Sequence, residues 1–149
     1  MDLLIKRLNP RATLPCFMSE GSAGMDLFAC LEECAYPIIW PGRWVLIPTG
    51  WAFKIPGGYE GQIRSRSGLA YKRGITVLNS PGTIDSDYRG ELKVMLINHG
   101  GRDFQVENGM RIAQLVISPI ERKNMVGLIE VDDLGETERG AGGFGSTGG

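Results

Sequence analysis

Glycine and proline divide this chain into short segments. The 149 residues include 22 glycines and 8 prolines, and both residue types interrupt long helices, glycine through its backbone freedom and proline through its missing N–H group. Apolar or alternating stretches recur between these breaks, at residues 44–47, 51–55, 59–64, 75–78, 91–98, 104–106 and 111–118. Short strands at such close spacing predict an all-β fold, a single jelly-roll-like barrel or sandwich domain.

The length of the chain fits one domain, with no residues to spare for a second. Apolar residues nearly vanish after Leu134, and six of the last eleven residues are glycine. Such a segment cannot build a core and should be disordered in isolation. We therefore expect a β domain over residues 1–134 and a flexible glycine-rich C-terminal arm over residues 135–149.

Charge and cysteine content limit the possible functions. The net charge of -1, without blocks of like charge, offers no footprint for nucleic acid or a membrane surface. The first residues lack the layout of a signal peptide, so we expect a cytoplasmic protein. Cys16, Cys30 and Cys34, with the single His99, do not have the spacing of zinc ligands. We expect reduced cysteines and a histidine in a hairpin turn at residues 97–101.

The run of residues 82–91 places two carboxylates and a phenol between two glycines, ahead of an apolar segment. This pattern predicts the tip of a β-hairpin that carries chemistry. For Asp87, a solvated turn is the simpler interpretation. Asp85 follows the apolar Ile84, so its carboxylate can be held out of bulk water and aimed at a ligand.

Residues 64–74 interrupt the strand pattern and predict the one short helix, with Ser67 as N-cap and Gly74 as C-cap. The N–H groups of the first turn, the Arg66 guanidinium and the Ser67 hydroxyl together would suit a phosphate chain. An ordinary capped helix with exposed arginines explains these residues equally well. The chain lacks the pattern of a P-loop nucleotide-binding site.

The glycine-rich tail contains Arg139 and Phe144, which have no evident structural task there. Arg139 could reach a terminal phosphate, and the Phe144 ring could stack on a base. A solubilising linker is the alternative interpretation of this composition.

Five motifs, in this order and at these spacings, closely resemble the homotrimeric, all-β dUTP pyrophosphatase (dUTPase) family. They occupy residues 23–29, 66–70, 82–91, 109–115 and 139–148. The resemblance implies hydrolysis of dUTP to dUMP and pyrophosphate by water attack on the α-phosphorus, with Mg²⁺ as cofactor. This reaction keeps uracil out of DNA and supplies dUMP for dTMP synthesis. The resemblance also implies a homotrimer in which three chains contribute to each site.

The resemblance implies roles for residues near the base and the sugar. Asp85 would be the general base, and Tyr88 would pack beneath the deoxyribose and leave no room for a 2′-hydroxyl. The remaining residues of this group would read the edge of uracil: Asn79, Thr83, Ile84 and Lys93.

It also implies roles around the phosphates. Gln114 and Arg66 would position the α-phosphate and the attacking water, and Ser67 with Gly68 would contact the β-phosphate. Asp26 would support the water shell of Mg²⁺ and so bind the metal indirectly. Three residues of the tail would form a lid over the nucleotide: Arg139 near the γ-phosphate, Phe144 on the uracil, and the adjoining Gly145.

Two positions depart from the family pattern. Ser65 stands where proline is frequent, which we expect to loosen the approach to the helix, and Met110 stands where an acidic residue is common. Arg111 is open to two interpretations, a structural ion pair or a ligand contact. Two other functions stay open as well: a dCTP deaminase of the same fold, and a non-catalytic nucleotide-sensing trimer.

Overall fold

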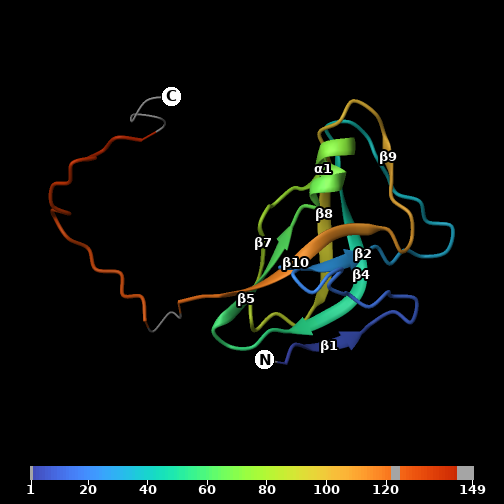
Figure 1. Ribbon diagram of the computed structural model, residues 1–149, viewed down its shortest axis with the longest axis horizontal. Helices are drawn as coiled ribbons and strands as arrows, with labels where there is room; N and C mark the ends of the chain where they lie inside the picture. Colours follow the sequence, from blue (N-terminus) through green and yellow to red (C-terminus); the bar gives the residue numbers. More distant parts are fainter. Residues whose placement is uncertain (1, 122–124, 144–149) are drawn as a thin grey trace.

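The computed structural model of the protein describes residues 2–121 and 125–143. This part of the chain contains one helix, α1 (Ser67–Arg73), and is otherwise built of strands and loops (Figure 1). The strands are β1 (Leu4–Arg7), β2 (Met25–Phe28), β3 (Ile38–Ile39), β4 (Trp44–Lys54), β5 (Tyr59–Arg64), β6 (Ile75–Val77), β7 (Gly82–Ile84), β8 (Glu91–Asn98), β9 (Phe104–Gln105) and β10 (Arg111–Pro119). The predicted all-β fold with one short helix is confirmed.

The strands form two four-stranded sheets and a two-stranded sheet, all with antiparallel pairing. The order of the first sheet is β1-β4-β8-β6, that of the second is β2-β10-β5-β7, and β3 pairs with β9. Neighbours in each sheet are distant in sequence, so every sheet draws its strands from both halves of the chain. The sequence could therefore indicate strands, but not their order.

Strand β4 spans residues that the sequence divides into two predicted strands, at 44–47 and 51–55. Its pairing with β8 shifts register between Pro48 and Ala52. Gly50, inside this irregularity, has a φ of +73°, and a Cβ atom there would lie 2.6 Å from the Cβ of Ala12. The break in the sequence pattern is thus a glycine bulge within one long strand, not the end of a strand.

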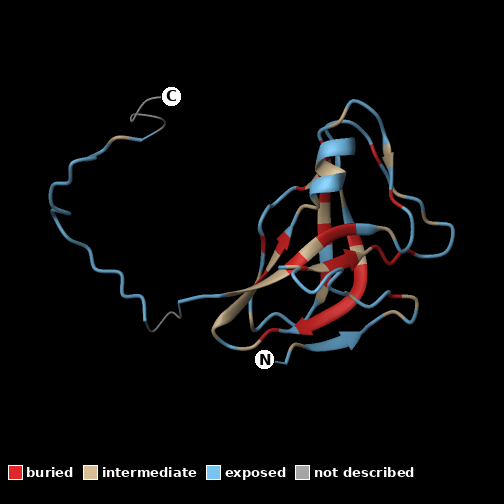
Figure 2. Cartoon of the chain, in the orientation of Figure 1, coloured by how far each residue is buried: buried red, intermediate tan, exposed pale blue. Residues whose placement is uncertain are grey.

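The core lies between the two larger sheets. In β8, Leu92, Val94 and Leu96 are buried, and the residues between them are less buried, as period-2 alternation requires. Figure 2 shows buried segments along the central strands, whereas α1 contains no buried residue. Burial of each large aliphatic side chain contributes about 1.5–3 kcal/mol, so the sheets rather than the helix hold the fold.

Two predicted hairpins are wrong. Strands β7 and β8 flank the run 82–91, but β7 pairs with β5 in one sheet, whereas β8 pairs with β4 and β6 in the other. The loop between them therefore crosses between sheets. Likewise β8 and β9 flank residues 97–101 but do not pair with each other. In both places the turn residues are as predicted, but turn chemistry alone does not determine strand partners.

The part of the chain after β10 has no helix or strand within its described residues 120–121 and 125–143. It extends away from the sheets (Figure 1). Several apolar side chains in it are strongly exposed, including Leu128 at 97% and Leu134 at 94%. The division at residue 134 stays a prediction. Among the described residues, no helix is long and apolar enough to cross a lipid bilayer.

Candidate active site in two clusters

The first cluster surrounds Asp85. A cavity of about 320 Å³ is lined by Leu46, Thr83, Ile84, Asp85, Tyr88, Glu91 and Lys93. These residues come from β4, β7, β8 and the crossover loop, so the cavity joins β7, the edge strand of the second sheet, to the central strands β4 and β8 of the first. The Asp85 side chain is exposed and has no hydrogen bond or ion pair within the described residues. It is available to a ligand or to a water molecule.

Tyr88 and Lys93 are both anchored through Glu91. The Tyr88 hydroxyl donates to the main-chain carbonyl of Glu91 at 3.0 Å, which holds the ring across the crossover loop. The Lys93 ammonium lies 3.6 Å from the Glu91 carboxylate, whose other oxygen accepts a hydrogen bond from the Gly50 N–H at 2.8 Å. Leu46 and Glu91 were missed as pocket residues. The register of β4 against β8 explains Leu46, because it pairs with Met95, two residues from Lys93.

Asn79 lies outside the set of residues that line this cavity. It lies in the turn between β6 and β7, and a Cβ atom on Gly82 would lie 3.2 Å from its amide nitrogen. Asn79 is therefore near the start of β7, whereas Thr83 and Ile84 form the wall of the cavity.

The second cluster surrounds Asp26, a buried carboxylate on β2. One of its oxygens lies 3.3 Å from Nε of Arg66, and the other lies 3.3 Å from a terminal nitrogen of Arg111. Arg66 also donates to the main-chain carbonyl of Arg111 at 3.1 Å. The interpretation of Arg111 as a structural ion-pair partner is confirmed. Because the Asp26 side chain is only 11% exposed, its two arginines offset much of the cost of burying the charge.

Gln114 joins this cluster to the segment before α1. Its side-chain amide donates to the main-chain carbonyl of Ser65 at 3.0 Å, and the Ser65 hydroxyl accepts from the Val77 N–H at 2.9 Å. The Ser65 hydroxyl thus ties the approach to the helix to β6, and the expectation that Ser65 loosens this approach relative to proline stays a prediction. Gly24 packs close by, because a Cβ atom on it would lie 3.0 Å from the Gln114 amide oxygen.

Helix α1 begins one residue earlier than predicted. Arg66, not Ser67, is the N-cap, and no side chain caps the helix. The Arg66 carbonyl accepts the first helical bonds, from Leu69 and Ala70. Gly74 is the C-cap, as predicted, with a φ of +69°. The surface at Gly68 is open, because a Cβ atom placed there would meet no protein atom within 4 Å.

Arg139 lies in the extended C-terminal segment, apart from both clusters (Figure 1). Its guanidinium donates to the Gly142 carbonyl at 3.0 Å, and the Gly142 N–H donates to the Arg139 carbonyl at 3.1 Å. Arg139 is thus held in a local turn in this structure. Phe144 and Gly145 lie outside the described residues.

The two clusters occupy different parts of the second sheet. On β5, Arg64 pairs with Gln114, and Gly61 pairs with Ile84, the residue before Asp85. Asp85 and Gln114 are thus separated by two inter-strand spacings and by about four residues along the strands, or about 16 Å between Cα atoms. One chain does not bring them to a common phosphorus atom, since reacting groups must lie about 3–3.5 Å from the atoms they act on.

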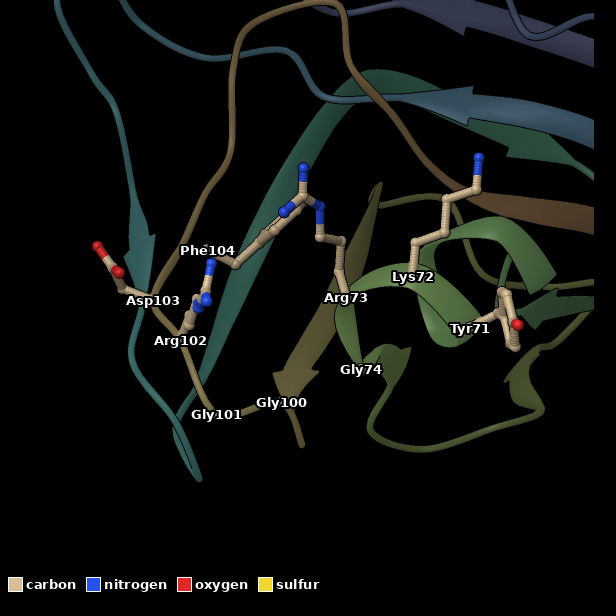
Figure 3. Close-up of a pocket in the computed structure, with 9 residues that line it drawn as sticks. All are labelled: Tyr71, Lys72, Arg73, Gly74, Gly100, Gly101, Arg102, Asp103 and Phe104. Carbon is tan, nitrogen blue, oxygen red and sulfur yellow. The ribbon is translucent and has the colours of Figure 1, made fainter.

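A different cavity, of about 480 Å³, lies at the C-terminal end of α1 against the loop between β8 and β9 (Figure 3). It contains none of the predicted site residues. Lys72 and Arg73 project from the last helical turn, where cations interact favourably with the helix dipole. That role accounts for these charges without a ligand, so we assign no part of the active site to this cavity.

Within residues 2–121 and 125–143, no three His, Cys, Asp or Glu side chains come together in a way that could hold a metal ion. Asp26 has two oxygens engaged with arginines, but a carboxylate has about four lone-pair sites and can still accept from water. The residues therefore fit a water-mediated contact to a cation that a phosphate chain carries, not a direct metal site.

Comparison with known proteins agrees with this geometry. The profile of the dUTPase family matches residues 10–148. The deoxyuridine 5'-triphosphate nucleotidohydrolase of Rhizobium rhizogenes is 56% identical over 91% of this chain and 85% of its own length. The enzyme of the same name from Nautilia profundicola is 56% identical over 99% of both chains.

Solved structures give the same result. A mutant dUTPase of Staphylococcus bacteriophage 80alpha, with dUpNHpp, superposes with a TM-score of 0.85 at 28% identity, over 99% of this chain and 98% of that one. A mutant dUTPase of phage phi11 of S. aureus, described with a structural Mg(II) ion, has a TM-score of 0.77 at 26% identity, over 90% of this chain and 99% of that one. The chain belongs to the dUTPase family.

Proposed function

We propose that this protein hydrolyses dUTP to dUMP and pyrophosphate, with Asp85 as the base that activates the attacking water. The observation that carries the proposal is the Asp85 carboxylate, which is exposed, has no partner among residues 2–121 and 125–143, and lines a cavity of about 320 Å³ together with Tyr88. Family membership supplies the substrate. Position distinguishes Asp85 from the nearby exposed carboxylate of Asp87, which does not line the cavity.

The cavity around Asp85 would bind the nucleoside. Thr83, Ile84 and Lys93 line it, and main-chain groups of these residues would read uracil, with Asn79 close to the start of β7. The Tyr88 ring would lie against the deoxyribose and exclude a 2′-hydroxyl by contact. An Asp85-bound water would then attack the α-phosphorus, and the Asp85 carboxylate would accept the proton.

The Asp26 cluster would bind the phosphates. Gln114 and Arg66 would hold the α-phosphate and orient the water, while Ser67 and Gly68 would contact the β-phosphate from the first turn of α1. Asp26 would act through Arg66. Its carboxylate lies 3.3 Å from Nε of Arg66, so the terminal nitrogens of that guanidinium can donate to other partners. One of those nitrogens already donates to the Arg111 carbonyl.

We also propose Mg²⁺ as the cofactor, held mainly by the triphosphate, with Asp26 contacting it only through water. When bound, the ion would neutralise charge on the phosphates, which favours attack by water. The support is the donor set described above, together with the preference of Mg²⁺ for retained water ligands.

Family membership suggests a homotrimer, and two observations support sites that are shared between copies of the chain. Asp85 and Gln114 of one chain are too far apart to act on one phosphorus atom, so a complete site needs Asp85 from one copy and Gln114 from another. The exposed Leu128, Ile129 and Leu134 also suit a C-terminal segment that packs on a neighbouring copy. The arm of residues 135–149 would close as a lid, with Arg139 at the γ-phosphate and Phe144 and Gly145 over the base. A cytoplasmic location stays a prediction.

An assay of pyrophosphate release from dUTP, dCTP, dTTP and UTP, with ammonia measured in parallel, tests the proposed reaction. The proposal predicts pyrophosphate from dUTP, little from the other three, and no ammonia. Ammonia from dCTP without dUTP turnover would assign the chain to the deaminases of the same fold. Nucleotide binding without any turnover would leave the non-catalytic sensor.

A further inference from the structure

We propose that Gly90 is a specificity-determining position, because its missing side chain sets where the Tyr88 ring lies in the nucleoside cavity. The inference rests on the proposed function, in which that ring contacts the sugar. Gly90 itself does not line the cavity, so it would act through Tyr88 and would be a positioning residue.

The contact between the two residues is very close. A Cβ atom built on Gly90 would lie 2.4 Å from the Tyr88 hydroxyl oxygen, 2.7 Å from Cζ and 3.0 Å from Cε2. Non-bonded carbon atoms prefer about 3.5–4.0 Å. The ring therefore occupies the volume that any side chain at residue 90 would need.

The backbone gives no competing reason for glycine at this position. Gly90 is not among the residues with a positive φ, in contrast to Gly50 and Gly74. A φ in the ordinary range gives alanine no strain at residue 90, and the three atoms nearest to its Cβ all belong to the Tyr88 side chain. Glycine is required here for the position of a neighbouring side chain, not for a turn.

The ring rather than the backbone would yield to a larger residue. Tyr88 is 45% exposed, and one hydrogen bond, from its hydroxyl to the Glu91 carbonyl at 3.0 Å, fixes the far end of the ring. An alanine at residue 90 would push the ring away and break that bond. Because the ring forms one wall of the cavity, its displacement changes the space available beside the sugar.

The test combines kinetics with a double-mutant cycle. Gly90→Ala should raise the ratio of kcat/KM for UTP over kcat/KM for dUTP by about tenfold or more, as expected when one contact that excludes a substituent is lost. In a Tyr88→Ala background, Gly90→Ala should change this ratio little, because the residue through which it acts is gone. Gly101→Ala is the matched control, since a Cβ atom there meets nothing within 4 Å.

A crystal structure of the Gly90→Ala protein gives a readout that does not depend on catalysis. We expect the Tyr88 ring to be displaced and its hydroxyl to leave the Glu91 carbonyl. An undisplaced ring, or an equal change of the substrate ratio with and without Tyr88, would overturn the inference. If the wild-type protein fails to hydrolyse dUTP, the proposed function fails, and the ring displacement still decides whether Gly90 positions Tyr88.

Discussion

Gln114 lies on β10, and Asp85 directly follows β7 of the same four-stranded sheet, about 16 Å away between Cα atoms, since two inter-strand spacings and about four residues separate them. If both act on one α-phosphate, they must come from different copies of the chain. We therefore expect Asp85→Asn and Gln114→Ala proteins, each nearly inactive alone, to regain activity when they are mixed and allowed to exchange subunits.

Random exchange of equal amounts should restore about a quarter of the sites, because each site takes Asp85 from one chain and Gln114 from another, and each of these residues is intact in half of the chains. dUTP turnover before and after mixing measures the recovery. A mixture of two Asp85→Asn preparations is the control and should recover nothing. Absence of recovery in the mixed sample, despite proven exchange, would mean that each site is built within one chain.

Asp85, the proposed general base, can be compared with Asp87, a nearby carboxylate on the surface. Asp85→Asn should keep nucleotide affinity but lower kcat by roughly 10²–10⁴, the range usual for loss of a general base. Asp87→Asn removes a nearby exposed carboxylate that does not line the cavity, and it should leave kcat almost unchanged. Steady-state kinetics and calorimetric binding on both variants measure the difference. Equal kcat values for the two variants would remove Asp85 from the mechanism.

Gly68 offers a test in which stability and activity move in opposite directions. Gly68→Ala introduces no clash with the protein, and it should stabilise α1 by up to about 1 kcal/mol, because alanine is the better helix former. If a phosphate approaches the main chain there, the added methyl group should raise KM for dUTP several-fold. Urea unfolding and steady-state kinetics measure the two effects.

Gly21→Ala is the control for this experiment, since its Cβ atom also meets no protein atom and residue 21 lies outside both clusters. It should change neither KM nor kcat. An unchanged KM in Gly68→Ala would show that the phosphates do not approach this turn.

Burial of Cys30 should make the free energy of unfolding depend on pH in the alkaline range. Its side chain is buried, at 4% exposure, and this burial raises the pKa of the thiol above its ordinary value. The unfolded chain therefore loses the proton first, and the free energy of unfolding should fall as the pH rises above about 8.5. Urea unfolding near neutral pH and at alkaline pH, for the wild type and Cys30→Ala, isolates this contribution. The same pH dependence in both proteins would contradict it.

The sequence predicted most elements but few of their partners. The bounds of β5 and β8 agree with the predicted strands at 59–64 and 91–98, because branched and alternating residues specify these strands locally. The short strands β1, β2, β3 and β7 were not predicted, since two to four residues carry too little periodicity. The run 82–91 was interpreted as a hairpin because its turn residues are visible in the sequence, whereas the crossing to another sheet depends on long-range packing.

The residues of the candidate site could likewise be placed together only where they are close in sequence. Asp85, Tyr88 and Thr83 could be placed together because they are neighbours in the chain. The ion pairs of Asp26 with Arg66 and Arg111 join residues 40 and 85 positions apart, and only the strand order β2-β10-β5 brings them into contact. The local sequence likewise could not show that Gly90 and the Tyr88 ring compete for the same space.

The central claim is that water activated by Asp85 attacks the α-phosphorus of dUTP. Hydrolysis of dUTP in ¹⁸O-enriched water, followed by mass spectrometry of both products, tests it most directly, because the oxygen from water stays on the phosphorus that it attacks. The account predicts one ¹⁸O atom in dUMP and none in pyrophosphate. Label in pyrophosphate instead of dUMP would place the attack on the β-phosphorus, where the Asp85 cavity has no part, and would contradict the account.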